Sequence, residues 1–256
     1  MPAELTIGLP ALYGFLLVLA RVSGVFAFVP LPGVQNAPPM ARIVLSVLTT
    51  LALYPSWPQP PAGQFEIGRM LMYVLPEVAV GVVIGVAVSF ILEAFMMGAQ
   101  VLSLNAGYSF AQTIDPTSQA QSGVLVVFAQ MASGLIFFAL GLDREVLRTL
   151  AYSLQAHPAG AWIARPAAEA MIRLSADMLS LALRLALPAV ALLILVDLSL
   201  GLVGRLNSQL QLLSLAFPLK MLAGLALLIW ITTLVPRLLG TYAGELFGTL
   251  RQMLRY

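Results

Sequence analysis

Apolar residues gather into six long runs along the chain, at 9–29, 41–54, 69–104, 123–142, 178–203 and 210–235. A helix needs about 20 mostly apolar residues to cross a bilayer, because its backbone groups must pair within the segment. The run 41–54 is short for this, and 69–104 is too long for one straight span and contains Pro76, so we expect a long kinked helix or two pieces. The pattern predicts an all-α, polytopic membrane protein with about six apolar, partly broken helical segments in hairpins.

Two polar stretches separate these runs. Residues 143–177 hold many of the charged residues, and Glu169, Arg173 and Asp177 recur at a spacing of four, which predicts an amphipathic surface helix with one charged face. Residues 103–122 are rich in Ser, Thr, Asn and Gln but carry a single charge, Asp115. Irregular backbone at membrane depth is tolerated where it lines an aqueous cavity. This second stretch is therefore either a solvated turn or the wall or plug of a pore.

The composition excludes several classes of protein. Charged residues make up 9% of the 256 residues and the mean hydropathy is +0.95, whereas soluble domains are about 25% charged. A soluble globular enzyme is therefore excluded. The net charge of +2 is too small for a polyanion-binding patch, so no nucleic acid partner is expected. With no cysteine and one histidine, the chain offers no thiol chemistry, and we predict no metal site and no cofactor.

A catalytic site is the least favoured interpretation. The segment Gly107-Tyr108-Ser109-Phe110-Ala111 is similar to the GxSx turn of intramembrane serine proteases, in which the serine needs a histidine base nearby. The one histidine, His157, lies in the charged stretch and is a poor partner for a serine at membrane depth. We therefore predict no catalytic residue.

Six ionisable residues fall well inside the apolar runs, away from their first residues: Arg21, Glu77, Glu93, Arg184, Asp197 and Lys220. Charges at membrane depth mark either a pathway or a buried pair. A proton or ion relay would make the protein a secondary transporter acting alone, but relays gather acids on one or two helices, and these residues are dispersed and mixed in sign. Pairing with one another or with a neighbouring subunit is favoured. Four cations next to proline or glycine helix breaks are expected at partner interfaces: Arg21, Arg42, Arg205 and Lys220.

Three blocks of sequence resemble one family. They are Arg21 with Pro30-Leu-Pro32-Gly33 and Arg42-Ile43-x-Leu45-Ser46; Gly107-x-Ser109-Phe110-Ala111 with Asp115-Pro116-x-Ser118; and Leu198-x-Leu200-Gly201-x-x-x-Arg205 with Gln209-Leu210 and Phe217-Pro218-Leu219. Together they are similar to the FliR proteins of the flagellar export gate and to their counterparts in non-flagellar type III secretion. Departures such as Asp197, where the family often has Asn, leave the subfamily open.

The resemblance implies a non-enzymatic subunit of a helical, channel-forming gate in the bacterial cytoplasmic (inner) membrane at the flagellar basal body. It implies contact with P-type and Q-type gate subunits, the B-type switch subunit, membrane lipid and exported unfolded polypeptides. It also implies a P-like region, residues 1–177, followed by a Q-like hairpin and tail, residues 178–256. Gln209, Phe217, Pro218 and Lys220 match the Q-type stretch and are expected at partner interfaces.

The resemblance places the loop 107–122 inside the pore as a plug, formed by Gly107, Tyr108, Ser109, Phe110, Asp115, Pro116 and Ser118. Physical reasoning favours the same role. In an extended loop Tyr108 and Phe110 project to one side and can block a narrow lumen by packing. Gly107 permits a sharp turn, Pro116 fixes the backbone angle φ in the second half of the loop, and Asp115 can accept hydrogen bonds from nearby backbone amides.

Overall fold

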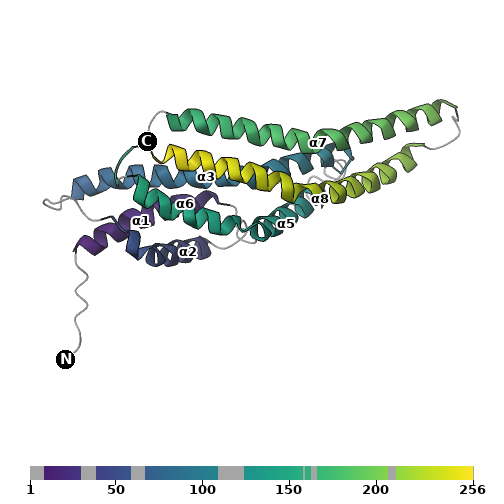
Figure 1. Cartoon of the computed structure of the whole chain (residues 1–256). Helices are drawn as coiled ribbons and strands as arrows, with labels where there is room; N and C mark the ends of the chain where they lie inside the picture. The colour runs from purple at the N-terminus through teal and green to yellow at the C-terminus, as the bar shows by residue number, and fades with distance from the viewer. Residues whose placement is uncertain are drawn as a thin grey trace. The chain divides into compact units, whose positions relative to one another are not determined.

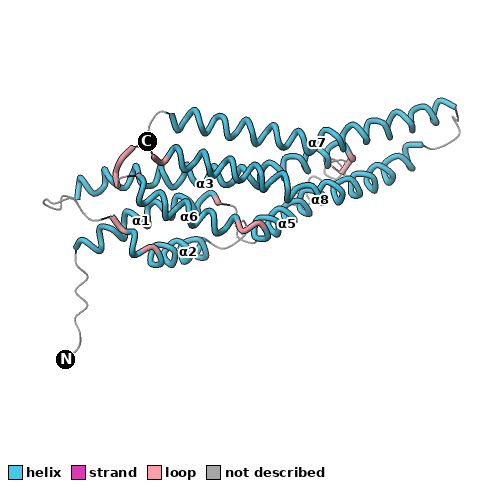
Figure 2. The backbone as a smooth tube through the Cα atoms, viewed as in Figure 1, coloured by secondary structure: helices cyan, strands magenta, loops and turns pink. Residues whose placement is uncertain are grey.

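A computed structural model describes residues 9–29, 39–58, 67–108, 124–157, 159–162, 166–206 and 212–255. Within these ranges the chain is almost entirely helical and has no strand (Figure 2). The elements are α1 (Leu9–Phe28), α2 (Pro39–Ala52), the short 3-10 helix η1 (Tyr54–Ser56), α3 (Ile67–Asn105), α5 (Val124–Ala139), α6 (Leu142–Ala156), α7 (Pro166–Leu206) and α8 (Leu212–Met253) (Figure 1). The all-α prediction is confirmed, and among the described residues a helix covers most of each of the six apolar runs.

The helices differ in length from the predicted segments. Within the described residues, four of them (α1, α3, α7 and α8) are long and apolar enough to cross a membrane, and the bent pair α5 and α6 makes a fifth candidate. The 14 residues of α2 are too few to span a bilayer. Pro76 does not end its helix, and α3 runs through it for 39 residues as one element. The approximate count of six segments is thus refined to four or five candidate spans.

The stretch 143–177 is more deeply built into the fold than a surface helix. Its first part forms α6, whose buried residues Leu142, Val146 and Leu150 recur every four positions. Its last part is the beginning of α7, where Glu169, Arg173 and Asp177 are exposed as predicted. The apolar residues between the charges give α6 a stripe that packs inward, as in an amphipathic helix, while the rest of the stretch continues into the apolar run of α7.

Two compact units make up the chain. Unit 1 comprises Met1–Phe90, Gly141–Ser175 and Ala243–Tyr256, and unit 2 comprises Ile91–Leu140 and Ala176–Tyr242. Each has its own fully buried side chains. In unit 1 they include Leu17 and Val22 of α1, Ile84 of α3 and Leu150 of α6; in unit 2 they include Phe95 of α3, Phe137 of α5, Leu193 of α7 and Leu228 of α8.

Glycines bring α1 and α3 into close contact in unit 1. A Cβ placed on Gly81 would overlap the backbone carbonyl oxygen of Arg21, and one on Gly85 would lie 2.6 Å from the carbonyl oxygen of Val25. Gly24 of α1 is equally close to α3, since its Cβ would lie 2.8 Å from the carbonyl oxygen of Val78. Small residues such as those of Gly81-x-x-x-Gly85 permit this close approach of two helices, and it sets the spacing at which side chains of α1 and α3 can meet.

The faces of α2 are reversed relative to a helix of a soluble protein. Its polar residues Ser46 and Thr50 are buried, and the Trp57 indole Nε1 donates a hydrogen bond of 2.9 Å to the carbonyl oxygen of Thr50. Its large apolar side chains are exposed: Met40, Ile43, Val44, Leu48 and Leu51. An outward apolar face suits lipid or another protein rather than water.

Candidate functional site

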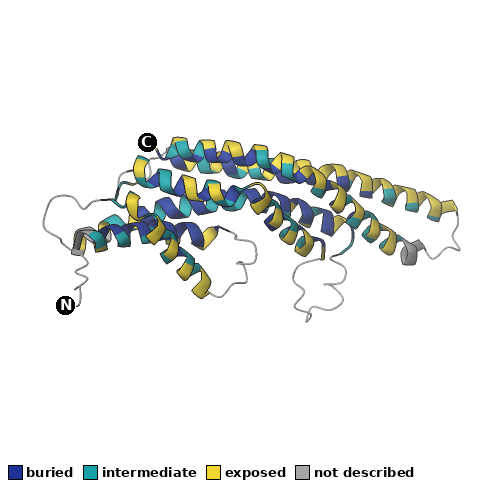
Figure 3. Cartoon of the chain, turned by 60° about the horizontal axis from the view of Figure 1, so that its bottom comes forward, coloured by how far each residue is buried: buried dark blue, intermediate teal, exposed yellow. Residues whose placement is uncertain are grey.

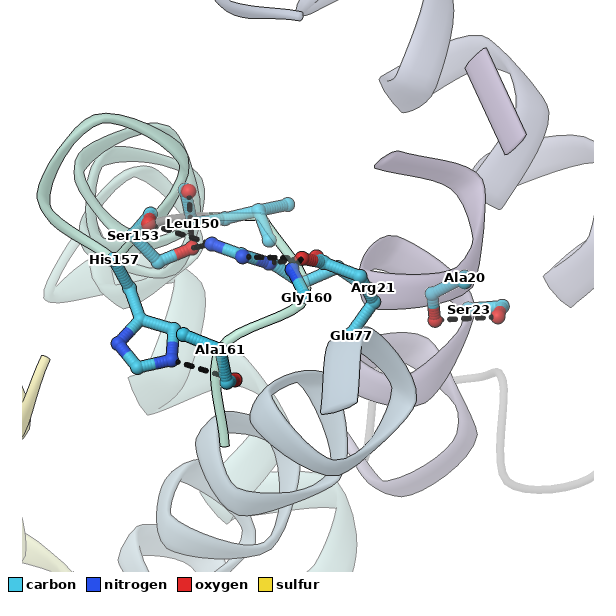
Figure 4. A network of polar contacts seen from close by, with 9 residues as sticks. All are labelled: Ala20, Arg21, Ser23, Glu77, Leu150, Ser153, His157, Gly160 and Ala161. Atoms are coloured by element: carbon cyan, nitrogen blue, oxygen red, sulfur yellow. Dashed lines mark hydrogen bonds and ion pairs between the residues drawn. The ribbon is translucent and has the colours of Figure 1, made fainter. Parts of the chain in front are cut away.

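A buried polar cluster in unit 1 centres on Arg21, which is 1% exposed (Figure 4). Its Nε donates to Glu77 Oε2 at 2.6 Å and its Nη2 to Glu77 Oε1 at 3.0 Å. Its Nη1 donates to the carbonyl oxygen of Ser153 at 2.5 Å and to Ser153 Oγ at 3.2 Å. One guanidinium thus joins α1, α3 and α6, and its charge is balanced by the Glu77 carboxylate.

The segment after α6 completes this cluster. The backbone N–H of Gly160 donates to Glu77 Oε1 at 3.0 Å, and His157 Nε2 lies 3.0 Å from the carbonyl oxygen of Ala161. Gly160 has a φ of +79°, which glycine adopts without strain. Both oxygens of the buried carboxylate therefore have donors, as a buried charge requires. The prediction that charges within the apolar runs pair with one another is confirmed for Arg21 and Glu77.

Polar contacts also join α6 to the end of α8 within unit 1. Glu145 Oε2 accepts from Arg251 Nη2 at 2.6 Å, while its other oxygen accepts from Arg148 Nη1 at 2.6 Å. Arg255 Nε donates to the Tyr152 hydroxyl at 2.7 Å, and this bond raises the pKa of Arg255. These groups are more exposed than Arg21, so removing one of them should cost less than removing one member of the buried pair.

The described start of the predicted plug loop lies against α8 in unit 2. Gly107 has a φ of +87°, and the Tyr108 hydroxyl donates 2.9 Å to the carbonyl oxygen of Met221. Burial raises the pKa of the Tyr108 hydroxyl, so it stays protonated and able to donate. A Cβ on Gly107 would lie 3.5 Å from the Phe217 ring, and one on Gly224 would lie 2.5 Å from Ala106 Cβ. The remaining predicted plug residues, Ser109, Phe110, Asp115, Pro116 and Ser118, lie outside the described residues.

The predicted interface residues that the structure describes here lie toward the end of α7 and toward the start of α8. Lys220 Nζ donates to Asp197 Oδ2 at 2.8 Å, and the Asp197 side chain is 50% exposed. Arg205 is exposed near the end of α7, and Pro218 is exposed on α8. Gln209 lies outside the described residues. The structure therefore brings Lys220 together with Asp197 and leaves half of the carboxylate surface open.

An apolar groove of about 540 Å³ lies between α7 and α8 beside this pair. Its lining is almost wholly apolar and includes Leu192, Leu195 and Leu200 of α7 and Leu219, Ala223 and Leu227 of α8. Figure 3 shows exposed residues following both helices toward the loop that joins them. Such a surface favours contact with further apolar helices or lipid tails.

Of the predicted cations, Arg42 and Arg21 differ in their surroundings. Arg42 is half-buried on α2, and its Nη1 lies 3.4 Å from the carbonyl oxygen of Ala27 at the end of α1. The Arg21 guanidinium, by contrast, is bonded within the chain, so its interface role stays a prediction that the fold does not require. Glu77 was among the charges expected to pair, but its pairing with Arg21 in particular and the roles of Ser153 and Gly160 were not predicted, because no local pattern connects residues so distant in sequence.

The described residues provide no group of three His, Cys, Asp or Glu side chains that could hold a metal ion. Long apolar helices, an outward apolar face on α2 and a buried ion pair that joins three helices define a polytopic all-α membrane protein. Within this class the chain belongs to the bacterial export proteins, family 1, whose model matches residues 12–246. This match, together with the relatives described next, confirms the resemblance to the FliR family.

Three relatives are similar in sequence to this chain over most of their length. The chain is 25% identical to the flagellar biosynthetic protein FliR of Escherichia coli K12 over 92% of this chain and 90% of that protein. It is 28% identical to FliR of Bacillus subtilis 168 over 84% of each chain. It is 27% identical to FliR of Caulobacter vibrioides over 83% of this chain and 85% of that protein.

Proposed function

We propose that this protein is a non-enzymatic, channel-forming subunit of the flagellar type III export apparatus in the bacterial inner membrane, at the flagellar basal body. In this role it helps unfolded polypeptides pass across the membrane. Membership of the export family and the names of its relatives support a role in the flagellar export apparatus. The feature of the fold that supports a subunit role is the charge spacing along α7.

No stretch of 20 residues in α7 is free of exposed charge. The helix has 41 residues and is therefore about 62 Å long, about twice the hydrocarbon thickness of a bilayer. Its longest uncharged stretch lies between Arg184 and Asp197, both exposed, which are about 20 Å apart along the axis. A bilayer centred on this stretch would place Arg184 and Asp197 inside the edges of its hydrocarbon core, at a cost that contact with other protein helices would remove. Its exposed apolar and charged positions instead suit coverage by other protein helices.

The proposed partners are P-type and Q-type gate subunits and the B-type switch subunit of the same apparatus, with lipid on the remaining surface. The groove between α7 and α8 would receive an apolar helix, and the open side of Asp197 would face a partner donor. Arg42, Arg205, Gln209, Phe217, Pro218 and Lys220 are the proposed interface residues. The division into a P-like region, 1–177, and a Q-like hairpin and tail, 178–256, belongs to this proposal.

A charge substitution tests the partner interface. Lys220→Ala leaves Asp197 without its cation in a largely apolar setting, so we expect the recovery of P-type and Q-type partners to fall more than the level of this chain. Arg148→Ala, on a 70% exposed side chain, is the control and should leave recovery unchanged. Equal recovery of partners with Lys220→Ala and Arg148→Ala would exclude this interface.

Within the channel we propose that loop 107–122 is the plug. Its side chains are mostly uncharged and polar, so they can bind water when the loop is displaced, and Tyr108 and Phe110 supply bulk. Deleting 110–118 should leave the complex assembled but make the membrane permeable to ions and small dyes. A deletion strain that assembles normally and shows no leak would reduce the loop to a connector.

A further inference from the structure

The part of α3 that belongs to unit 2 carries a single charged residue. From Ile91 to Asn105 the sequence contains no Asp, Glu, Lys or Arg except Glu93, which lies about 18 Å along the helix axis from Asn105. The helix is one of the candidate membrane spans. Glu93 is half-buried in this apolar setting, and a charge at such a position calls for a partner.

Glu93 differs from the other two acidic residues that lie well inside apolar runs. Glu77 is paired with Arg21 at 2.6 Å, and Asp197 is paired with Lys220 at 2.8 Å. Among the described residues, none donates a hydrogen bond to the Glu93 carboxylate or forms an ion pair with it. The described part of the chain therefore provides a cation for two of these three carboxylates and none for the third.

The Glu93 carboxylate lies on the uncovered face of α3. Gly98, on the buried face, packs against α7, since a Cβ there would lie 3.2 Å from the carbonyl oxygen of Ala182. At about 100° per residue, Glu93 is about 140° around the helix from Gly98. Three exposed residues lie with Glu93 within an arc of about 60°: Met97, Gln100 and Leu104. We call these four residues the α3 stripe.

The composition of the α3 stripe suits another protein helix better than lipid. Met97 and Leu104 offer apolar contact. Glu93 and Gln100, two turns apart, offer polar groups that acyl chains cannot satisfy, and Gln100 also has no hydrogen-bond partner among the described residues. A helix that lies along the stripe would meet both polar groups. The donor that matches a carboxylate in such a place is an arginine or a lysine.

We propose that the α3 stripe is a docking surface for an apolar helix of a neighbouring gate subunit, and that Glu93 binds an arginine or lysine of that helix. This inference rests on the proposed function and deepens it, because it adds a contact outside the α7–α8 hairpin and names the chemistry of its partner. Arg21 of α1 and Glu77 of α3 form the same kind of pair between two helices inside the chain.

Removing the charge of Glu93 tests the docking surface. Glu93→Gln keeps the size of the side chain, and we expect it to raise the protein concentration at which half of the detergent-extracted complex dissociates. The expected rise is about tenfold to a hundredfold, the range for one hydrogen bond to a charged group. Glu93→Lys sets a cation against a cation and should weaken association further. Glu169→Gln is the matched control, since Glu169 is exposed near the start of α7, and it should leave dissociation unchanged.

The stability of the purified chain separates docking from a structural role. Because no described residue pairs with Glu93, Glu93→Gln should leave the melting temperature of this chain unchanged or raise it. A lower melting temperature together with loss of the complex would show that Glu93 supports the fold of its own chain. That result would overturn the docking surface.

A photo-crosslink and a charge swap identify the partner residue. The substitution Met97→benzoylphenylalanine, one turn from Glu93, captures what lies on the α3 stripe, and mass spectrometry identifies the captured peptide. We expect a peptide of a gate subunit that contains Arg or Lys, and exchange of that residue for Glu should restore association of the Glu93→Lys variant. Capture of lipid alone, or of a second copy of this chain, would overturn the proposal.

Failure of this inference is distinguishable from failure of the proposed function. If the original chain purifies with P-type and Q-type subunits, and Glu93→Gln holds them as tightly as Glu169→Gln does, the docking surface is wrong and the proposed function stands. If the original chain purifies without any gate subunit, the proposed function fails, and the docking surface fails with it.

Discussion

The buried pair of Arg21 and Glu77 gives the strongest quantitative prediction about stability. The two side chains are 1% and 2% exposed and are joined at 2.6 Å. Removing one member leaves the other charge buried without its partner, which costs about 3–5 kcal/mol. We therefore expect Arg21→Ala and Glu77→Ala each to lower the folded-to-unfolded ratio by about a hundredfold to a few thousandfold.

Removing both charges should be less harmful than removing either one. In Arg21→Met with Glu77→Met the buried charges are gone, and apolar groups of similar length fill their space. The Gly160 N–H and the Ser153 carbonyl lose their partners, which leaves a remaining cost of about 1–3 kcal/mol. The double variant should thus lie between the original chain and either single variant in stability.

Thermal or denaturant unfolding of the purified protein in mild detergent measures this order. Arg148→Ala provides the control, because its side chain is 70% exposed in its pair with Glu145 and such a pair is worth about 0–1 kcal/mol. The reasoning is refuted if Arg21→Ala is no more destabilising than Arg148→Ala. It is refuted equally if the double variant loses the sum of the two single losses.

Three further predictions concern close backbone contacts, a strained glycine and one side-chain hydrogen bond. Gly81→Ala should destabilise the protein by about 1–3 kcal/mol, since its Cβ would overlap the Arg21 carbonyl. Gly248→Ala is the control: nothing lies within 4 Å of its added Cβ, so it should be neutral or stabilise by up to about 1 kcal/mol, and an equal loss of stability in both variants would contradict the close approach of α1 and α3. Gly141→Ala should cost about 1–2 kcal/mol, because Gly141 has a φ of +67° in open space, and an unchanged melting temperature would exclude this strain. Trp57→Phe should cost about 0.5–1.5 kcal/mol through loss of the bond to the Thr50 carbonyl, and calorimetry of the two proteins checks it.

The sequence predicts the helices well because their signal is local. A helix covers most of each apolar run among the described residues. The lengths were harder to predict, since Pro76 left open either one long kinked helix or two pieces, and α3 is a single helix. The length of α7 was also hard to predict. Its exposed charges near the start were predicted, but no local pattern shows that the charged segment and the apolar run after it form one helix.

Long-range partners could not be predicted for a physical reason. Sequence reasoning concluded that buried charges pair, but Arg21 and Glu77 are 56 residues apart and Arg21 and Ser153 are 132 apart. Their meeting depends on how α1, α3 and α6 pack. The inward stripe of α6 was visible as Leu142, Val146 and Leu150, yet the surrounding charges made the stretch resemble a surface helix. Likewise, no pattern in the loop joins Tyr108 to Met221.

The central claim is that the surface of α7 and α8 is covered by other subunits of an export gate. The most direct measurement is to express the tagged chain together with the genes of its apparatus, extract it in mild detergent and weigh the intact particles by native mass spectrometry. The account predicts one large complex that contains this chain with P-type and Q-type subunits. A monodisperse monomer, stable in detergent and without bound subunits, would contradict it.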